Sequence, residues 1–165
     1  MPRVRFIVIF LALLAALEFV LLIDVFDSYA VQPFTRQIAN VAGLIIGAME
    51  PGVRINGTII SSPCFAVDIK NGCNGLEATF FVLAAVIAFP AVWRDRIIGI
   101  IIGAVLIQFA NMARVVTLFL IGCHRREWFE TFHLAVWQTV IFALAVGFFI
   151  FWSRRSAPKK SAAPA

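Results

Sequence analysis

The chain has 165 residues, of which 62% are hydrophobic and only 14% are charged, and its formal net charge is +5. A soluble domain of this length buries only about two-thirds of its chain's surface, so it cannot hide so much apolar side chain. The same composition excludes a disordered chain. A nucleic-acid-binding module is excluded because the Lys and Arg residues are dispersed between apolar blocks. The composition therefore indicates one integral membrane domain.

Four apolar segments are long enough to cross a bilayer as helices. A spanning helix needs roughly 20 apolar residues, because it rises 1.5 Å per residue through about 30 Å of hydrocarbon. The predicted spans are residues 6–23, 75–93, 97–122 and 131–152. A further apolar segment, 38–49, has only 12 residues. Its length favours a helix lying in the membrane interface.

The positions of the cationic residues predict the orientation, because cytoplasmic loops carry an excess of Lys and Arg. With four spans and both termini inside, the cytoplasmic cations are Arg3, Arg5, Arg94, Arg96, Arg154, Arg155, Lys159 and Lys160. The external cations are Arg36, Arg54, Lys70, Arg125 and Arg126. Counting segment 38–49 as a fifth span reverses this bias. We therefore expect a multi-pass protein of the cytoplasmic membrane, with its first span retained rather than cleaved as a signal peptide.

The remaining segments complete the predicted architecture. Segment 52–72 alternates apolar and polar residues around Asn56-Gly57, which predicts one or two short hairpins on the outer surface. The end of the chain, 153–165, is small, basic and contains proline, which predicts a disordered cytoplasmic tail. The expected fold is an all-α membrane domain over residues 1–152, with about four transmembrane helices, an interfacial helix and an extracytoplasmic hairpin region.

The first polar island is segment 71–78, where the outer loop enters the second span. Asn74 and Glu77 are three residues apart, which is a capping-box spacing and predicts that a helix begins at Gly75. Cys73 then stands just before the helix N-terminus, whose partial positive charge favours a reactive thiolate. From spacing alone, an ordinary loop cysteine, free or disulfide-bonded, beside a structural cap is the alternative.

The second island consists of Gln108, Asn111 and Arg114 inside the third span. Asn111 and Arg114 are three residues apart and are therefore neighbours on the helix surface. A guanidinium within the membrane is costly, so it normally faces protein or water and marks a functional site. Two structural alternatives are open. Arg114 forms an ion pair with Glu18 or Glu77, or it extends toward the outer head groups.

The third island is His133, at the outer end of the last span. Alone it is an interfacial polar residue, but the predicted topology places it on the same side as Cys73 and Arg114. This trio suits acyl transfer: the thiolate attacks a carbonyl, the imidazole protonates the leaving amine, and the guanidinium or backbone N–H groups stabilise the oxyanion. A site at the membrane surface indicates a membrane-tethered substrate.

These residues carry a family resemblance. Cys73 within Asn-Gly-Cys-Asn-Gly-Leu-Glu-Ala, Arg114 within 111–115, and the later His133 resemble the Cys, Arg and His signatures of the exosortase/archaeosortase family. The short chain and the motif Cys-Asn-Gly-Leu-Glu-Ala resemble the exosortase H branch in particular. The resemblance covers roughly residues 52–152.

The resemblance implies a membrane-embedded cysteine protease or transpeptidase without a cofactor. Its substrates would be exported, membrane-tethered proteins with a C-terminal sorting signal, made of a short motif (of the Ile-Pro-Thr-Leu type in this branch), a hydrophobic helix and a basic tail. Cys73 would be the nucleophile that forms a thioester, Arg114 the oxyanion or substrate-positioning group, and His133 the general acid/base. The residues expected to support them are Asn74, Glu77 and Asn111.

Two other functions are open from the residues. A thiol–disulfide or quinone-linked redox protein would use Cys64, Cys73 and Cys123, although there is no Cys-x-x-Cys and an odd count leaves one thiol unpaired. A Cys64–Cys123 disulfide that leaves Cys73 free would fit the protease. A non-enzymatic membrane assembly factor would use Arg114 only to hold helices together. Metal binding is poorly supported, because apart from the adjacent Cys123-His124 no ligand spacing is present.

Overall fold

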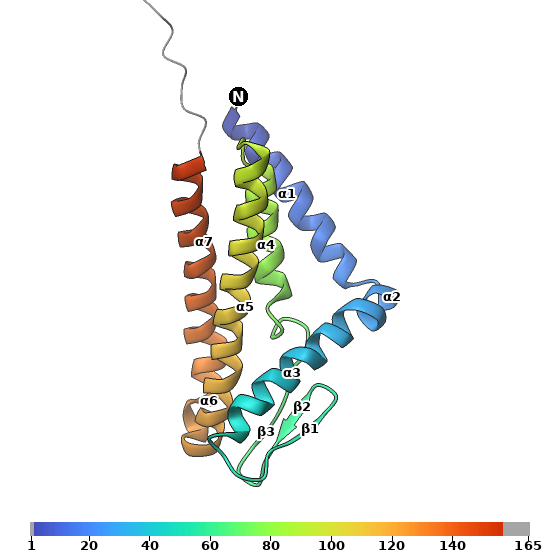
Figure 1. The fold of residues 1–165 in the computed structure, drawn as a ribbon, viewed down its shortest axis with the longest axis vertical. Coiled ribbons are helices and arrows are strands. Elements are labelled where there is room, and N and C mark those ends of the chain that lie inside the picture. The colour runs from blue at the N-terminus through green and yellow to red at the C-terminus, as the bar shows by residue number, and fades with distance from the viewer. Residues whose placement is uncertain (1, 157–165) are drawn as a thin grey trace, which may run out of the picture.

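The computed structural model describes residues 2–156, which are mostly helical. Three long helices and one shorter helix run along the long axis of the molecule, and a crossing helix and a small sheet lie at the lower end in Figure 1. The axial helices are α1 (Pro2–Leu21), α4 (Leu76–Ala88), α5 (Trp93–His124) and α7 (Trp137–Ser156). The two ends of the described chain lie at the same end of the bundle, as both-inside termini require.

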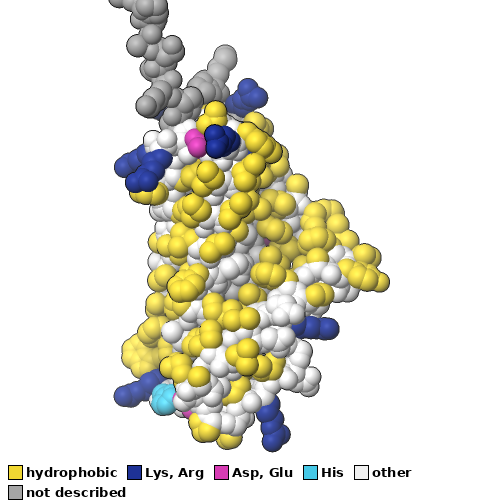
Figure 2. Space-filling model, in the orientation of Figure 1, with side chains coloured by type: hydrophobic (Ala, Val, Ile, Leu, Met, Phe, Trp, Pro, Cys, Tyr) yellow, Lys and Arg dark blue, Asp and Glu magenta, His cyan; other side chains and the backbone are white. Residues whose placement is uncertain are grey.

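Three helical stretches have the length and hydropathy of membrane spans: Arg3–Leu21, Trp93–His124 and Arg126–Ser156. Hydrophobic side chains cover the middle of the molecule in Figure 2, while Lys and Arg side chains gather toward its two ends. This arrangement is the one expected in a bilayer, where the apolar belt contacts the hydrocarbon core and the charged ends contact the head groups and water. The chain is therefore a multi-pass membrane protein, as the composition predicts.

The predicted second span, 75–93, is shorter than expected. The helix α4 has 13 residues, which reach only about 20 Å, because Phe89 is extended (φ −75°, ψ 136°) before Pro90. Proline disfavours the α conformation in the residue before it, so the helix ends there. Within the described residues, four full-length spans are thus not established. The short helix α4 nevertheless packs against α1, α5 and α7 and completes the bundle.

The crossing helix α3 (Gln32–Gly47) is longer than the predicted segment 38–49. It follows the short α2 (Asp24–Phe26) and the π-helical turn η1 (Asp27–Val31). Its buried residues are mostly small or apolar and recur at helical spacing: Thr35, Ile38, Ala39, Ala42, Gly43 and Ile46. The apolar members Ile38, Ala39, Ala42 and Ile46 form one core cluster with residues of α5 and the sheet region.

The predicted β region is a three-stranded antiparallel sheet of β1 (Arg54–Asn56), β2 (Ile59–Ser61) and β3 (Ala66–Asp68), in that order. A two-residue loop joins β1 to β2, and its Gly57 has φ +64°. The Asn-Gly signal therefore marks a hairpin turn, as predicted. The sheet carries β3 at one edge, next to α5.

The last helix is built from four consecutive pieces. After α5 come the 3₁₀ turn η2 (Arg126–Trp128), α6 (Phe129–Thr131), the π-helical turn η3 (Phe132–Val136) and α7. Residues 153–156 of the predicted tail are helical, because α7 continues through Ser156. The rest of that tail, 157–165, lies outside the described residues.

Two glycines of α5 allow neighbouring helices to approach closely. A methyl group at Gly103 would lie 2.5 Å from Val82 Cγ1 of α4 and 2.7 Å from Phe148 Cε1 of α7, and Gly99 packs in the same way against Trp152. This small-residue face is therefore not free to dock a substrate helix. The face is occupied by the protein's own α4 and α7.

We expect Gly103→Ala to lower the stability of the folded protein by about 1–3 kcal/mol, because the added methyl overpacks the α4–α5–α7 contact. The matched control is Gly147→Ala on α7, where an added methyl meets no atom within 4 Å. That variant should be neutral or slightly more stable, since alanine favours a helix. Thermal unfolding in detergent measures both. Equal melting temperatures for the two variants would contradict the packing.

Candidate active site

Cys73 lies in a tight turn immediately before α4. Its N–H donates to the carbonyl of Lys70 over 2.9 Å, and Gly72 in between has φ +83°. A positive φ at the third residue of a turn is the type II pattern, which favours glycine at that position. Gly75 at the start of α4 also has a positive φ, +80°. Two glycines thus shape the backbone on either side of the cysteine.

Asn74 anchors this turn to the crossing helix α3. Its side chain is almost fully buried, its Nδ2 donates to Thr35 Oγ1 over 3.0 Å, and its Oδ1 accepts from the Leu76 N–H over 3.1 Å. Asn74 therefore satisfies one orphan donor of the helix start. The predicted capping box is wrong in its details. The helix α4 begins at Leu76, and the Glu77 carboxylate lies beside Gly72 instead of closing the box.

Arg114 holds the cysteine turn from the side of α5. Only 5% of its surface is exposed, its Nη1 donates to the Gly72 carbonyl over 3.4 Å, and its Nη2 lies 3.8 Å from Cys73 Sγ. The only ion pair within the described residues joins His124 to Glu50, so Arg114 pairs with neither Glu18 nor Glu77. Its burial excludes extension toward the head groups. The guanidinium is directed at the cysteine.

His133 reaches the same cysteine from the last helix. Its Nε2 lies 3.3 Å from Cys73 Sγ, which is a hydrogen-bond contact to sulfur. His133 belongs to the π-helical turn η3, and such turns occur frequently at functional sites. Phe129 packs against the imidazole with ring centroids 5.6 Å apart, and Phe65 packs on Phe129 at 5.1 Å. Two aromatic rings therefore support the orientation of the histidine.

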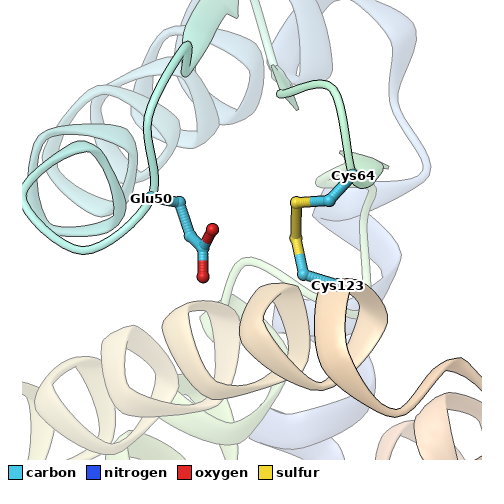
Figure 3. Close-up of side chains that lie close together, drawn as sticks. All are labelled: Glu50, Cys64 and Cys123. Atoms are coloured by element: carbon cyan, nitrogen blue, oxygen red, sulfur yellow. A yellow bond between two sulfur atoms is a disulfide. The ribbon is translucent and has the colours of Figure 1, made fainter.

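The other two cysteines form a disulfide between the loop after β2 and the end of α5. Cys64 and Cys123 are bonded (Figure 3), and Cys73 is the free cysteine. Glu50 lies beside the two sulfurs. Because sulfurs in a disulfide cannot bind a metal as thiolates, this cluster does not indicate a metal site. The disulfide ties Cys64 to the end of α5. The ring of the next residue, Phe65, packs against Phe119 and lies over Gly122.

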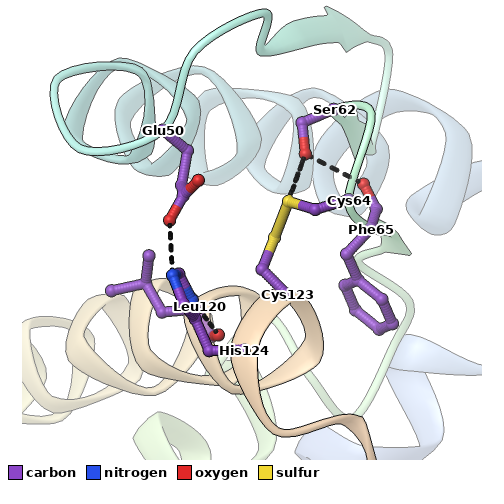
Figure 4. The surroundings of a disulfide bond; sticks show 7 residues. All are labelled: Glu50, Ser62, Cys64, Phe65, Leu120, Cys123 and His124. Atoms are coloured by element: carbon purple, nitrogen blue, oxygen red, sulfur yellow. Dashed lines mark hydrogen bonds and ion pairs between the residues drawn. A yellow bond between two sulfur atoms is a disulfide. The ribbon is translucent and has the colours of Figure 1, made fainter.

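Hydrogen bonds surround the disulfide in Figure 4. Ser62 Oγ lies 2.9 Å from Cys64 Sγ and bonds back to Phe65. His124 faces solvent, with 64% of its side chain exposed and its Nε2 3.4 Å from Glu50. It lies beside the disulfide and does not line the cleft that contains Cys73.

The three side chains open into a cleft of about 480 Å³. Every residue from Phe65 to Asn71 lines the cleft, together with residues of α5 and of the segment containing Phe129 and His133. Arg114 also borders a smaller cavity of about 110 Å³ that contains Glu77 and Gln138. The guanidinium therefore stands between two cavities. It can contact a bound group as well as the cysteine turn.

Asn111 lies one helical turn before Arg114 and is completely buried. Neither atom of its amide has a hydrogen-bond partner within the described residues. The amide packs against Gly75, because a methyl group placed there would lie 3.0 Å from Asn111 Cβ and Cγ. Gln108 adds a hydrogen bond from its Nε2 to Thr79 Oγ1 over 3.1 Å. The polar face of α5 therefore packs directly beneath the cysteine turn.

A comparison with known protein families identifies the family of the chain. Residues 2–153 match the family described as transmembrane exosortase (Exosortase_EpsH). The chain belongs to the transmembrane exosortase family. This is a family of membrane proteins of the sorting-protease type. No curated protein and no solved structure matches the chain.

The structure brings Cys73, Arg114 and His133 into one contact group, and it places Asn74, Glu77 and Asn111 around the same turn. Sequence reasoning missed the aromatic rings of Phe65 and Phe129, because an aromatic residue in an apolar chain carries no distinctive signal. It also missed the role of the strand β3 as a wall of the cleft. The positive φ of Gly72 and Gly75 was signalled by two Asn-Gly dipeptides, which favour turns.

We expect Gly75→Ala to displace the cysteine turn. A side chain at φ +80° costs about 1–3 kcal/mol, and the new methyl would also press on Asn111 and on Gln108 Nε2, 2.9 Å away. Gly57→Ala is the control, since its φ is also positive but a methyl there meets no atom. The rate at which iodoacetamide alkylates Cys73 should change only in the Gly75 variant. The same rate in both variants would show that the Gly75 contact does not position the cysteine.

Proposed function

We propose that this exosortase is a cysteine endopeptidase or transpeptidase that cleaves the C-terminal sorting signals of exported proteins. The observation that carries the proposal is the contact group itself. A free thiol lies 3.3 Å from an imidazole nitrogen and 3.8 Å from a guanidinium nitrogen, in a cleft open to a ligand. A nucleophile within reach of its base, beside a fixed donor, is the general arrangement for acyl transfer.

In the first step, His133 takes the proton of the Cys73 thiol, and the sulfur attacks the carbonyl carbon of the scissile peptide. A C–S bond forms, and the carbonyl oxygen becomes an oxyanion. Arg114 is a fixed cation at the place where this negative charge develops.

In the second step, the tetrahedral intermediate collapses to a thioester. The C–N bond breaks as His133 returns its proton to the leaving amine, which departs with the hydrophobic helix and basic tail. Water or an amine then attacks the thioester and releases Cys73. The cleft is open to either acceptor, so the proposal covers both hydrolysis and transpeptidation.

The geometry of α5 supports a site at the outer surface of the cytoplasmic membrane. Arg114 lies 21 residues after Trp93, a rise of about 31 Å, which is close to the thickness of the hydrocarbon layer. The sheet and the disulfide lie beyond that level. Disulfides persist in oxidising compartments such as the periplasm, so this end of the molecule faces outward. On this topology α4 completes a fourth, shortened crossing, and α3 lies in the interface.

This placement favours a substrate that is itself anchored in the membrane. A cleft at the boundary of the bilayer is reached by a peptide bond next to a membrane-inserted helix. A sorting signal offers such a bond, since its short motif precedes a hydrophobic helix and a basic tail. The likeness to the exosortase H branch supports a motif of the Ile-Pro-Thr-Leu type. Asn74 and Asn111 would act through the cysteine turn, because Asn74 ties it to α3 and Asn111 packs under Gly75, while Glu77 lies beside Gly72.

Co-expression with a tail-bearing substrate tests the proposal. Cys73→Ala should abolish removal of the tail, because no other free thiol is present in the described residues. His133→Ala should slow it by roughly 10²–10⁴, the usual contribution of a general acid/base. Arg114→Lys should slow it by roughly 10²–10³, because lysine lacks the fixed fork of donors. Immunoblotting of the substrate measures each. If the tail were still removed normally in the presence of Cys73→Ala, the protease proposal would fail and a non-enzymatic assembly factor would be the better explanation.

The double variant Cys64→Ser/Cys123→Ser separates the protease from a thiol–disulfide redox protein. The disulfide closes a loop of 59 residues, so its loss should cost roughly 2–5 kcal/mol of stability. Tail removal at 25 °C should persist, because the reaction needs only Cys73. A redox protein would instead lose all activity with its disulfide. Cys73→Ser provides the matched control, since it removes a thiol but keeps the disulfide.

A further inference from the structure

We propose that the cleft binds its substrate as an added β-strand, paired with the free edge of β3. The inference rests on the proposed protease function and names how that substrate is held. The occupant is an extended segment of the sorting substrate beside the scissile bond. Four observations carry it: the register of the sheet, the unpaired groups of β3, the path of the cleft, and its continuity with Cys73.

The register decides which backbone groups of β3 are free. The Ser62 N–H donates to the Phe65 carbonyl over 2.8 Å, and the Ile69 N–H donates to the Thr58 carbonyl over 3.1 Å. In an antiparallel pair, hydrogen-bonded positions alternate with positions that do not bond to that partner. Phe65, Val67 and Ile69 therefore bond toward β2. The N–H and C=O groups of Ala66 and Asp68 point to the opposite, free edge.

These four outward groups have no partner among residues 2–156. Within the described residues, no hydrogen bond reaches the backbone of Ala66 or Asp68, and both residues are exposed. The sheet has no fourth strand, because β3 is its last member. An edge of this kind is a template for pairing with another chain.

The cleft follows this edge. Every residue from Phe65 to Asn71 lines it. Successive side chains of a strand point to opposite faces, so a cavity lined by a continuous run lies along the backbone edge and not on one face. The opposite wall carries the apolar side chains of Val115, Leu118 and Phe129. The cleft therefore offers backbone hydrogen bonds on one side and an apolar surface for a side chain on the other.

The same cleft ends at the reactive group. Cys73 follows Asp68 by five residues through the Lys70–Cys73 turn, and Cys73, Arg114 and His133 border the cleft together with β3. A peptide paired with Ala66 and Asp68 can form up to four backbone hydrogen bonds and then continue past the sulfur. Strand addition gives affinity through the main chain and selectivity through alternate side-chain pockets. It also holds the substrate extended, the form in which a scissile carbonyl is accessible.

The first test removes one edge donor from the enzyme. Ala66→Pro deletes an N–H that points away from β2, and proline is tolerated at such edge positions. The variant should process a co-expressed tail-bearing substrate roughly tenfold more slowly than Ala66→Ser, which changes the same side chain but keeps the N–H. Iodoacetamide should alkylate Cys73 at the wild-type rate in both variants. Equal processing by the proline and serine variants would overturn strand addition while leaving the protease intact.

The second test leaves the enzyme fold untouched. A synthetic peptide of about ten residues centred on the Ile-Pro-Thr-Leu-type motif is bound to purified Cys73→Ala protein, and each of its backbone N–H groups is methylated in turn, the proline having none. Binding should weaken roughly tenfold at two residues that are two positions apart and stay unchanged at the residue between them, because two alternate N–H groups of the peptide meet the free carbonyls of Ala66 and Asp68. A uniform effect, or none, would overturn the inference. Alternation in a protein that never removes tails would instead overturn the proposed function and keep the strand site.

Discussion

The architecture depends on one buried guanidinium. Arg114 is 5% exposed and has no carboxylate partner within the described residues, and its contacts are the Gly72 carbonyl and the Cys73 sulfur. A cation taken into an apolar bundle is costly unless nearby groups solvate it. The cysteine turn supplies that solvation. The same requirement therefore folds the loop down against α5 and places the nucleophile beside a positive charge.

The rest of the site is arranged around this contact. Asn74 ties the turn to α3 through Thr35, and Asn111 packs under Gly75. The histidine comes from a different helix, and it is supported by Phe129. The turn, α5 and the last helix thus each contribute one side chain to a single point. Loss of any one support should alter the geometry at the sulfur without removing a reacting atom.

The sequence predicted the long helices well and the short ones poorly. Apolar length decides a full span, so segments 97–122 and 131–152 lie within helical stretches of the structure, and segment 6–23 passes the end of α1 by only two residues. The end of α4 was misplaced because hydropathy continues through Pro90, whereas the backbone requirement of proline does not. The extent of α3 was underestimated because its first turns are mostly polar and lack the regular spacing of apolar residues that predicts a helix.

The site could be predicted by position but not by contact. The topology placed Cys73, Arg114 and His133 at one depth, yet their separation depends on the π-helical turn at His133 and on the two positive-φ glycines. The disulfide was not decidable from three cysteines, because any two can pair. Its consequence is structural: Cys64 fixes Phe65, and Phe65 supports Phe129.

The central claim is that the Cys73 sulfur becomes acylated by the substrate with help from its two neighbours. Intact-mass and peptide mass spectrometry of the protein, purified after co-expression with a tail-bearing substrate, measures this directly. The account predicts a substrate fragment joined to the peptide that contains Cys73, released by hydroxylamine as a thioester should be. Tail removal without any such adduct, or an adduct on another residue, would contradict it.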